Sequence, residues 1–86
     1  MKLRKDIAVS EAGLVFNPNT GESFSVNPIG IEILALLRED KDFEEICGKI
    51  TEKYSTTRDD FERDFGDFME VLSQYQLLVG DEKKNA

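Results

Sequence analysis

Apolar and polar residues alternate in short runs along the first third of the chain. Residues 22–27 read Glu-Ser-Phe-Ser-Val-Asn, which places Phe24 and Val26 on one face of an extended strand and polar residues on the other. Residues 13–17 include the apolar run Leu-Val-Phe, with one β-branched and one aromatic residue, and the Asn-Pro-Asn-Thr-Gly stretch between the two runs is rich in turn formers. With a further run at residues 6–10, the pattern predicts a three-stranded antiparallel sheet in which the second and third strands form a hairpin.

The spacing of apolar residues becomes helical after Asn27. The side chain of this asparagine can accept a hydrogen bond from the first turn of a helix, and Pro28 suits the first helical position because it has no N–H to lose. We therefore expect a first helix from Pro28 to about Arg38. Its apolar residues are numerous enough to bury much of its surface, as in a central core helix. They are Ile29, Ile31, Ile33, Leu34, Ala35, Leu36 and Leu37.

Two further helices are predicted from possible N-caps, each followed by an acidic residue three positions later. Asp42 with Glu45 opens a second helix of about 12 residues that ends near Tyr54, and Thr57 with Asp60 opens a third. The apolar side chains of the third helix are unusually aromatic and span about 160° of its circumference, at ~100° per residue. They are Phe61, Phe65, Phe68, Met69, Val71, Leu72 and Tyr75. A stripe this wide predicts that one flank of the helix lines a groove.

The order of these elements predicts an α+β fold, a winged helix-turn-helix in which an N-terminal three-stranded antiparallel sheet is followed by three helices. A chain of 86 residues has room for one core. We expect a single domain over residues 1–80 and a charged, disordered tail over residues 81–86.

Winged helices commonly read DNA with basic and amide side chains on their last helix. Here residues 58–70 carry six acidic and two basic side chains and the net charge is -7, so this DNA chemistry is missing.

The side chains that most catalytic and metal sites require are absent from the sequence. There is no histidine, and the single cysteine, Cys47, lies on the apolar face of the second helix, where a thiol acts as a small hydrophobe. The acidic residues of the third helix have helical spacing and no glycine-centred loop, a pattern typical of a solvated face. We therefore expect no enzymatic activity, no metal and no cofactor. The lack of a signal-like or membrane-spanning apolar run predicts a cytoplasmic protein that does not bind membranes.

Several segments resemble the PqqD-like family, whose fold is the winged-helix domain called the RiPP precursor peptide recognition element. The resemblance extends from about Leu3 to Val79 and begins with a basic N-terminal strand. The segments that carry it are Phe-Ser-Val-Asn at 24–27, Ile-Gly-Ile-Glu-Ile-Leu at 29–34, Phe-Glu-Glu-Ile at 43–46, Tyr54, and residues 64–72, which are similar to the family's Asp, Val, two spacers, Phe-Leu, two spacers, Leu segment. Val26 departs from the usual Leu, and Gly66 interrupts the third helix.

The resemblance implies a peptide chaperone. In this family the leader of a ribosomally made precursor peptide adds as a strand beside the third strand, packs against the third helix, and is presented to a modifying enzyme such as a radical SAM protein. The peptide-binding residues implied here are Ser23, Phe24, Ser25, Val26, Phe61, Asp64, Phe65, Phe68, Met69 and Leu72. The acidic flank that includes Asp64 and Asp67 favours a leader with Lys or Arg beside its apolar anchors.

Two other functional classes stay open, a winged-helix transcriptional regulator and a protein–protein interaction subunit. Steep salt dependence of DNA binding would identify the regulator.

Overall fold

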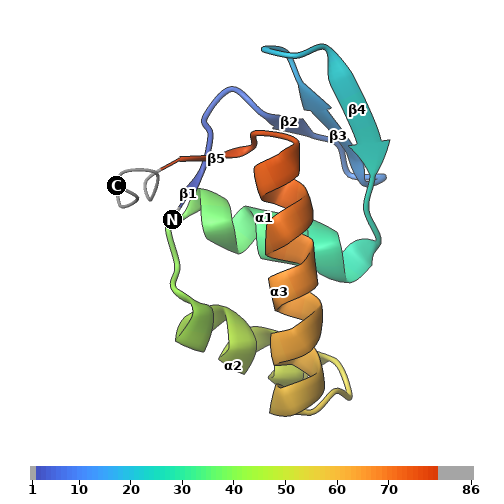
Figure 1. The fold of residues 1–86 in the computed structure, drawn as a ribbon. Helices are drawn as coiled ribbons and strands as arrows, with labels where there is room; N and C mark the ends of the chain where they lie inside the picture. Colours follow the sequence, from blue (N-terminus) through green and yellow to red (C-terminus); the bar gives the residue numbers. More distant parts are fainter. Residues whose placement is uncertain (1, 80–86) are drawn as a thin grey trace, which may run out of the picture.

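A computed structural model describes residues 2–79 and has a three-stranded sheet at one end of the longest helix (Figure 1). The sheet consists of β2 (Ala8–Val9), β3 (Leu14–Asn17) and β4 (Glu22–Ser25), antiparallel and in the order β2-β3-β4. Three helices follow it in the chain, which confirms the predicted α+β winged helix-turn-helix. The predicted tail over residues 81–86 lies outside the described residues.

The hairpin is closed by a glycine turn at one end and by a close backbone approach at the other. The Gly21 N–H donates to the Asn17 carbonyl over 2.8 Å, and Gly21 has a φ of 78°. At the open end the Val26 N–H donates to the Gly13 carbonyl over 2.8 Å. Gly13 has a φ of 94°, and a Cβ there would collide with the Val26 carbonyl oxygen, so glycine is required. The prediction that the strand continues to Asn27 is wrong, because that residue is used to cap the following helix.

The three helices are α1 (Pro28–Arg38), α2 (Phe43–Lys53) and α3 (Arg58–Gln74). Each begins after a side chain that accepts a hydrogen bond from the backbone N–H three residues later, at distances of 2.8, 3.0 and 3.1 Å in chain order. The carboxylates of Glu45 and Asp60 pair with neighbouring basic side chains. All three predicted N-caps are confirmed, and they are Asn27, Asp42 and Thr57.

The core joins the inner face of β3 to the apolar faces of all three helices. Cys47 is 2% exposed within it and serves as a packing residue, as its place on the apolar face predicts. Figure 1 shows α2 near the start of α3 and the sheet near its end. The buried apolar residues are Leu3, Ile7, Val15, Ile33, Leu34, Leu37, Ile46, Cys47, Ile50, Phe61, Leu72 and Leu77.

A second sheet joins the two ends of the described chain and was not predicted. β1 (Lys2–Leu3) pairs antiparallel with β5 (Leu78–Val79). The chain reverses for this pairing at a helix C-cap, where Gln76 has a φ of 61° and the Leu77 N–H donates to the Leu72 carbonyl over 3.0 Å. The resemblance implied a basic N-terminal strand, but its partner β5 lies at the other end of the described chain, where a local sequence pattern cannot pair the two.

Residues 2–79 include no helix with the length and apolar character of a membrane span. The same residues bring together no group of three or more cysteine, aspartate or glutamate side chains that could hold a metal ion.

Candidate functional site

β4 is an edge strand, because β3 is its one neighbour in the sheet described over residues 2–79. The Val26 N–H donates to the carbonyl of Gly13, the residue before β3, and hydrogen-bonded residues alternate along an antiparallel pair. Phe24 therefore points its backbone groups at β3, whereas Ser23 and Ser25 point theirs to the open edge. The N–H and C=O groups of these two serines are available to another extended chain.

Two hollows lie along α3 beside this edge, one between the sheet and α3 and the other between the start of α1 and α3. The first, which we call the edge hollow, has a volume of about 250 Å³ and is lined by Phe24, Ser25, Val26, Asn27, Phe68 and Val71. The second, the helix hollow, has a volume of about 210 Å³ and its lining includes Asn27, Ile29, Phe61, Asp64, Phe65 and Phe68. Asn27 and Phe68 line both hollows, so the two adjoin along one surface, which we call the groove.

The structure brings most of the predicted site residues to this groove. Phe68 stands at the junction of the two hollows, and Ser23 lies at the open edge with an exposed side chain. The residues that line one hollow or both are Phe24, Ser25, Val26, Phe61, Asp64, Phe65 and Phe68. The strand edge and the apolar helix flank, which the resemblance implied as the two sides of one binding surface, lie next to each other in the structure.

Two predicted contact residues lie elsewhere. Leu72 is 0% exposed and belongs to the core, so its side chain offers no surface to a ligand. Met69 lines a separate hollow of about 230 Å³ with Leu37, Phe43 and Ile46. At 100° per residue, the side chain of Met69 is rotated by about 100° from that of Phe68, which places it on the other flank of α3.

Val71 is a groove residue that the sequence-based list of contacts omits. It lines the edge hollow and is 38% exposed. Its signal in the sequence is its position seven residues after Asp64, because residues seven apart return to nearly the same side of a helix. Val71 therefore extends the groove two turns along α3.

Aromatic rings stiffen both ends of the groove. Phe24 stacks on Tyr75 with ring centroids 4.4 Å apart and an angle of 23° between the ring planes. At the other end Phe65 packs against Phe61 and Phe43, with centroid distances of 5.6 and 5.1 Å. Such pairs stabilise a fixed arrangement beyond the area that they bury.

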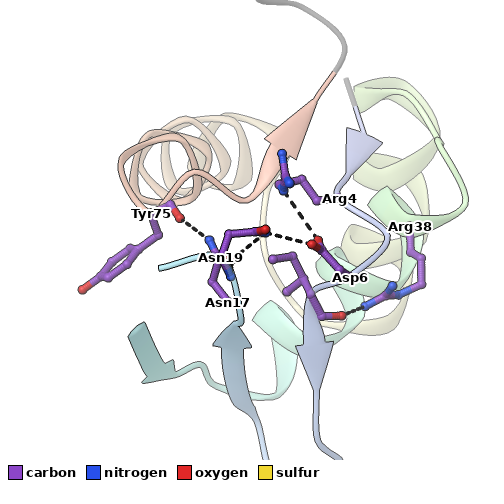
Figure 2. A network of polar contacts seen from close by, with 7 residues as sticks. Arg4, Asp6, Asn17, Asn19, Arg38 and Tyr75 are labelled. Carbon is purple, nitrogen blue, oxygen red and sulfur yellow. Dashed lines mark hydrogen bonds and ion pairs between the residues drawn. The ribbon is translucent and has the colours of Figure 1, made fainter. Parts of the chain in front are cut away.

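Figure 2 shows the polar network that holds the hairpin against the end of α3. Asn17 is 2% exposed, and its Nδ2 donates to the Tyr75 carbonyl over 3.0 Å. Its Oδ1 accepts from the Asn19 N–H over 2.9 Å, and Asn19 Nδ2 donates to Asp6 Oδ2 over 2.8 Å. The hydrogen bond from Asn19, supported by Arg4, holds the pKa of Asp6 below its usual value. The network thus fixes the hairpin relative to the helix that forms the opposite wall of the groove.

Most residues that line the groove are apolar. Its charged lining residue among residues 2–79 is Asp64, and its polar lining residues are Ser25, Asn27 and Thr56. An open strand edge beside an apolar trough can bind an extended peptide, with backbone pairing for affinity and pockets for side-chain selection.

Comparison with known proteins places this geometry in a family. The model of the family described as coenzyme PQQ synthesis protein D (PqqD) matches residues 13–78. Among solved structures, the chain is similar to TbiB1 in complex with the TbiA(beta) leader peptide, with a TM-score of 0.83 and 32% identity, over 93% of this chain and 96% of that one.

A second similar structure, lasso peptide synthetase B1 complexed with the leader peptide, has a TM-score of 0.78 and 22% identity, over 92% of this chain and 96% of that one. At that identity the likeness shows a shared fold. No match was found among curated proteins. Because the family match covers most of the sequence, this chain belongs to the PqqD family.

Proposed function

We propose that this protein binds the leader of a ribosomally made precursor peptide and presents it to a modifying enzyme, such as a radical SAM protein. The observation that carries the proposal is the open edge of β4, where Ser23 and Ser25 direct backbone groups outward beside the apolar groove. TbiB1, which is 32% identical to this chain, is in complex with a leader peptide. The leader would extend the sheet as a fourth strand.

The register of β4 defines which leader side chains enter the groove. A leader strand paired with Ser23 and Ser25 places the residues opposite Phe24 and Val26 on the inner face of the sheet, because side chains alternate between faces. These inner positions meet the edge hollow, with Phe68 and Val71 beyond. The expected leader therefore has apolar residues at alternate positions, and its outward side chains face solvent.

The role that we propose is recognition without catalysis. The sequence has no histidine, and its cysteine is buried in the core away from the groove. The groove contains one carboxylate and no second titratable group that could act as its acid or base partner among residues 2–79. We place the protein in the cytoplasm, where ribosomally made precursors and their modifying enzymes meet.

The charge of α3 argues against the alternative role of a DNA-binding regulator. Its acidic side chains are exposed along the outer surface of the helix, where they would repel the phosphate backbone. They are Asp59, Asp60, Glu62, Asp64, Asp67 and Glu70.

Nuclear magnetic resonance titration of the isotope-labelled protein with its cognate leader tests the proposal. Amide signals of residues 22–26 and 61–72 should shift, whereas those on the outer surface of α2 should not. Shifts that map to α2 would contradict strand addition at β4.

Proline at position 25 tests backbone pairing directly. Ser25→Pro removes an N–H that points to the open edge, so it spares the hydrogen bonds between β3 and β4 while weakening leader binding. Ser25→Ala is the matched control, since it keeps the N–H and should bind as the parent does. Circular dichroism first establishes that both variants are folded, and a folded proline variant with parental affinity would overturn the proposal.

A further inference from the structure

One carboxylate lies at the rim of an otherwise uncharged groove. Asp64 lines the helix hollow together with Phe61, Phe65 and Phe68. Asp64 is also exposed to solvent. Among residues 2–79 no other charged side chain lines either hollow. A ligand in this groove therefore meets aromatic faces and a single negative charge.

The basic residues of α3 are engaged elsewhere. Arg63 Nη2 lies 3.2 Å from Asp60 Oδ1, and Arg58 Nη2 lies 2.6 Å from Glu44 Oε2. Within the described part of the chain, no basic nitrogen lies within 4.0 Å of the Asp64 carboxylate. The negative charge at the groove is thus left for a ligand to complement.

The neighbouring surface carries the same sign of charge. On a helix with 100° per residue, Asp60 and Asp67 lie about 40° and about 60° from Asp64, on the side that faces away from the core. Both are exposed. Because Asp60 pairs with Arg63, the negative charge beside the groove comes from Asp64 and Asp67, which form no ion pair within residues 2–79.

We propose that Asp64 selects a lysine or arginine in the leader, next to an apolar side chain that fills the helix hollow. This inference rests on the proposed function and deepens it by naming the chemistry of the peptide. A leader paired with Ser23 and Ser25 passes Asn27 and Phe68 as it leaves the strand edge, and so enters the helix hollow. The basic residue of the leader lies in the segment that enters the helix hollow and not among the leader residues that pair with β4.

The apolar stem and the charged end of a lysine or arginine side chain both suit the surface beside Asp64. Its aliphatic stem packs on apolar surface while its charged end stays in water. The rings of Phe65 and Phe68 are half-buried and present such a surface beside the Asp64 carboxylate. An acidic leader residue at the same place would be repelled by Asp64 and its acidic neighbours.

Selection from a display library of random peptides of about 16 residues tests this inference on the whole protein, since that length covers the strand edge and both hollows. Enriched peptides should combine apolar residues at alternate positions with a lysine or arginine on one side of that segment. Affinities of an enriched peptide are then measured for the parent and for Asp64→Asn, which should bind about 3- to 10-fold more weakly.

Glu62→Gln is the matched control, because it removes the same charge from α3 at a position about 160° around the helix from Asp64. It should leave the affinity unchanged. Replacing the basic residue of the peptide by glutamine should abolish the difference between the parent and Asp64→Asn, as expected for a direct pair.

The outcomes separate the two proposals. Enrichment of apolar peptides without a basic residue, or equal loss of affinity in Asp64→Asn and Glu62→Gln, overturns the role of Asp64 and leaves leader binding intact. Failure to enrich any peptide, with the protein folded, overturns the proposed function and this inference with it.

Discussion

Phe24 of β4 and Tyr75 at the end of α3 stack their rings with centroids 4.4 Å apart. The contact joins residues 51 positions apart in the chain and connects the strand edge to the helix that faces it. The backbone carbonyl of Tyr75 also accepts the hydrogen bond from Asn17, so one residue receives both an apolar and a polar contact from the hairpin. The distance between the two walls of the groove therefore depends on this junction.

Substitution of Asn17 should be among the more destabilising polar changes in the protein. Asn17→Ala leaves the Tyr75 carbonyl without its partner in a buried setting, which should lower the free energy of unfolding by about 1–3 kcal/mol. Urea denaturation measures the change. Asn19→Ala, at an exposed position of the same network, should cost less, and an equal loss in both variants would contradict the role assigned to Asn17.

Asn27 should contribute the usual stability of an N-cap. Its Oδ1 accepts from the Gly30 N–H over 2.8 Å, so Asn27→Ala should lower the free energy of unfolding by ~1 kcal/mol without preventing folding. Asn27→Ser, which retains a capping oxygen, should restore most of the loss. A chemical denaturation midpoint unchanged by the alanine substitution would refute the capping role.

Glycine at position 76 should stabilise the protein. Gln76 has a φ of 61°, a conformation in which side chains other than glycine carry a steric cost. Gln76→Gly relieves that cost, but it also raises the conformational entropy of the unfolded chain, which offsets part of the benefit. We expect the free energy of unfolding to rise by about 0.5 kcal/mol. The control is Gln74→Gly, two residues earlier and within α3, which should lower stability by about 1 kcal/mol in the same thermal and urea measurements. Loss of stability in both variants would disprove the prediction.

Glu32 should make stability sensitive to acid. Its Oε2 lies 2.7 Å from Lys53 Nζ and accepts a hydrogen bond from the Tyr54 hydroxyl over 2.7 Å, and these two contacts hold the pKa of Glu32 below its usual value of 4.5. Because the folded protein binds the proton less tightly than the unfolded chain, the contribution is present above pH 4.5 and is lost as the pH falls through the lowered pKa.

Urea midpoints measured between about pH 7 and about pH 3 test this dependence. In the plot of urea midpoint against pH, Glu32→Gln should reduce the fall of the midpoint at low pH. Glu52→Gln, on the exposed surface of α2, should retain it. Parallel curves for the parent and Glu32→Gln would show that the contact between α1 and α2 has no effect on acid stability.

The local structure of this protein is determined largely by the sequence near each element. The N-caps at Asn27, Asp42 and Thr57 are recognisable because a short polar side chain reaches a backbone N–H three residues away, a contact that needs no distant partner. The turn at residues 17–21 and the alternation through β4 are equally local. These signals are sufficient to predict the three-stranded sheet, the order of the helices and the apolar stripe of α3.

The positions of the side chains around α3 were decided by tertiary packing. Phe68, Met69 and Leu72 share one apolar stripe in the sequence, but Phe68 lines the groove, Met69 faces another hollow and Leu72 is wholly buried. A helical period gives the angle of each side chain around its own axis and not the place where the sheet and the other helices meet that axis. The pairing of β1 with β5 and the bond from Asn17 to Tyr75 are likewise contacts between distant residues, which become visible once the chain has folded.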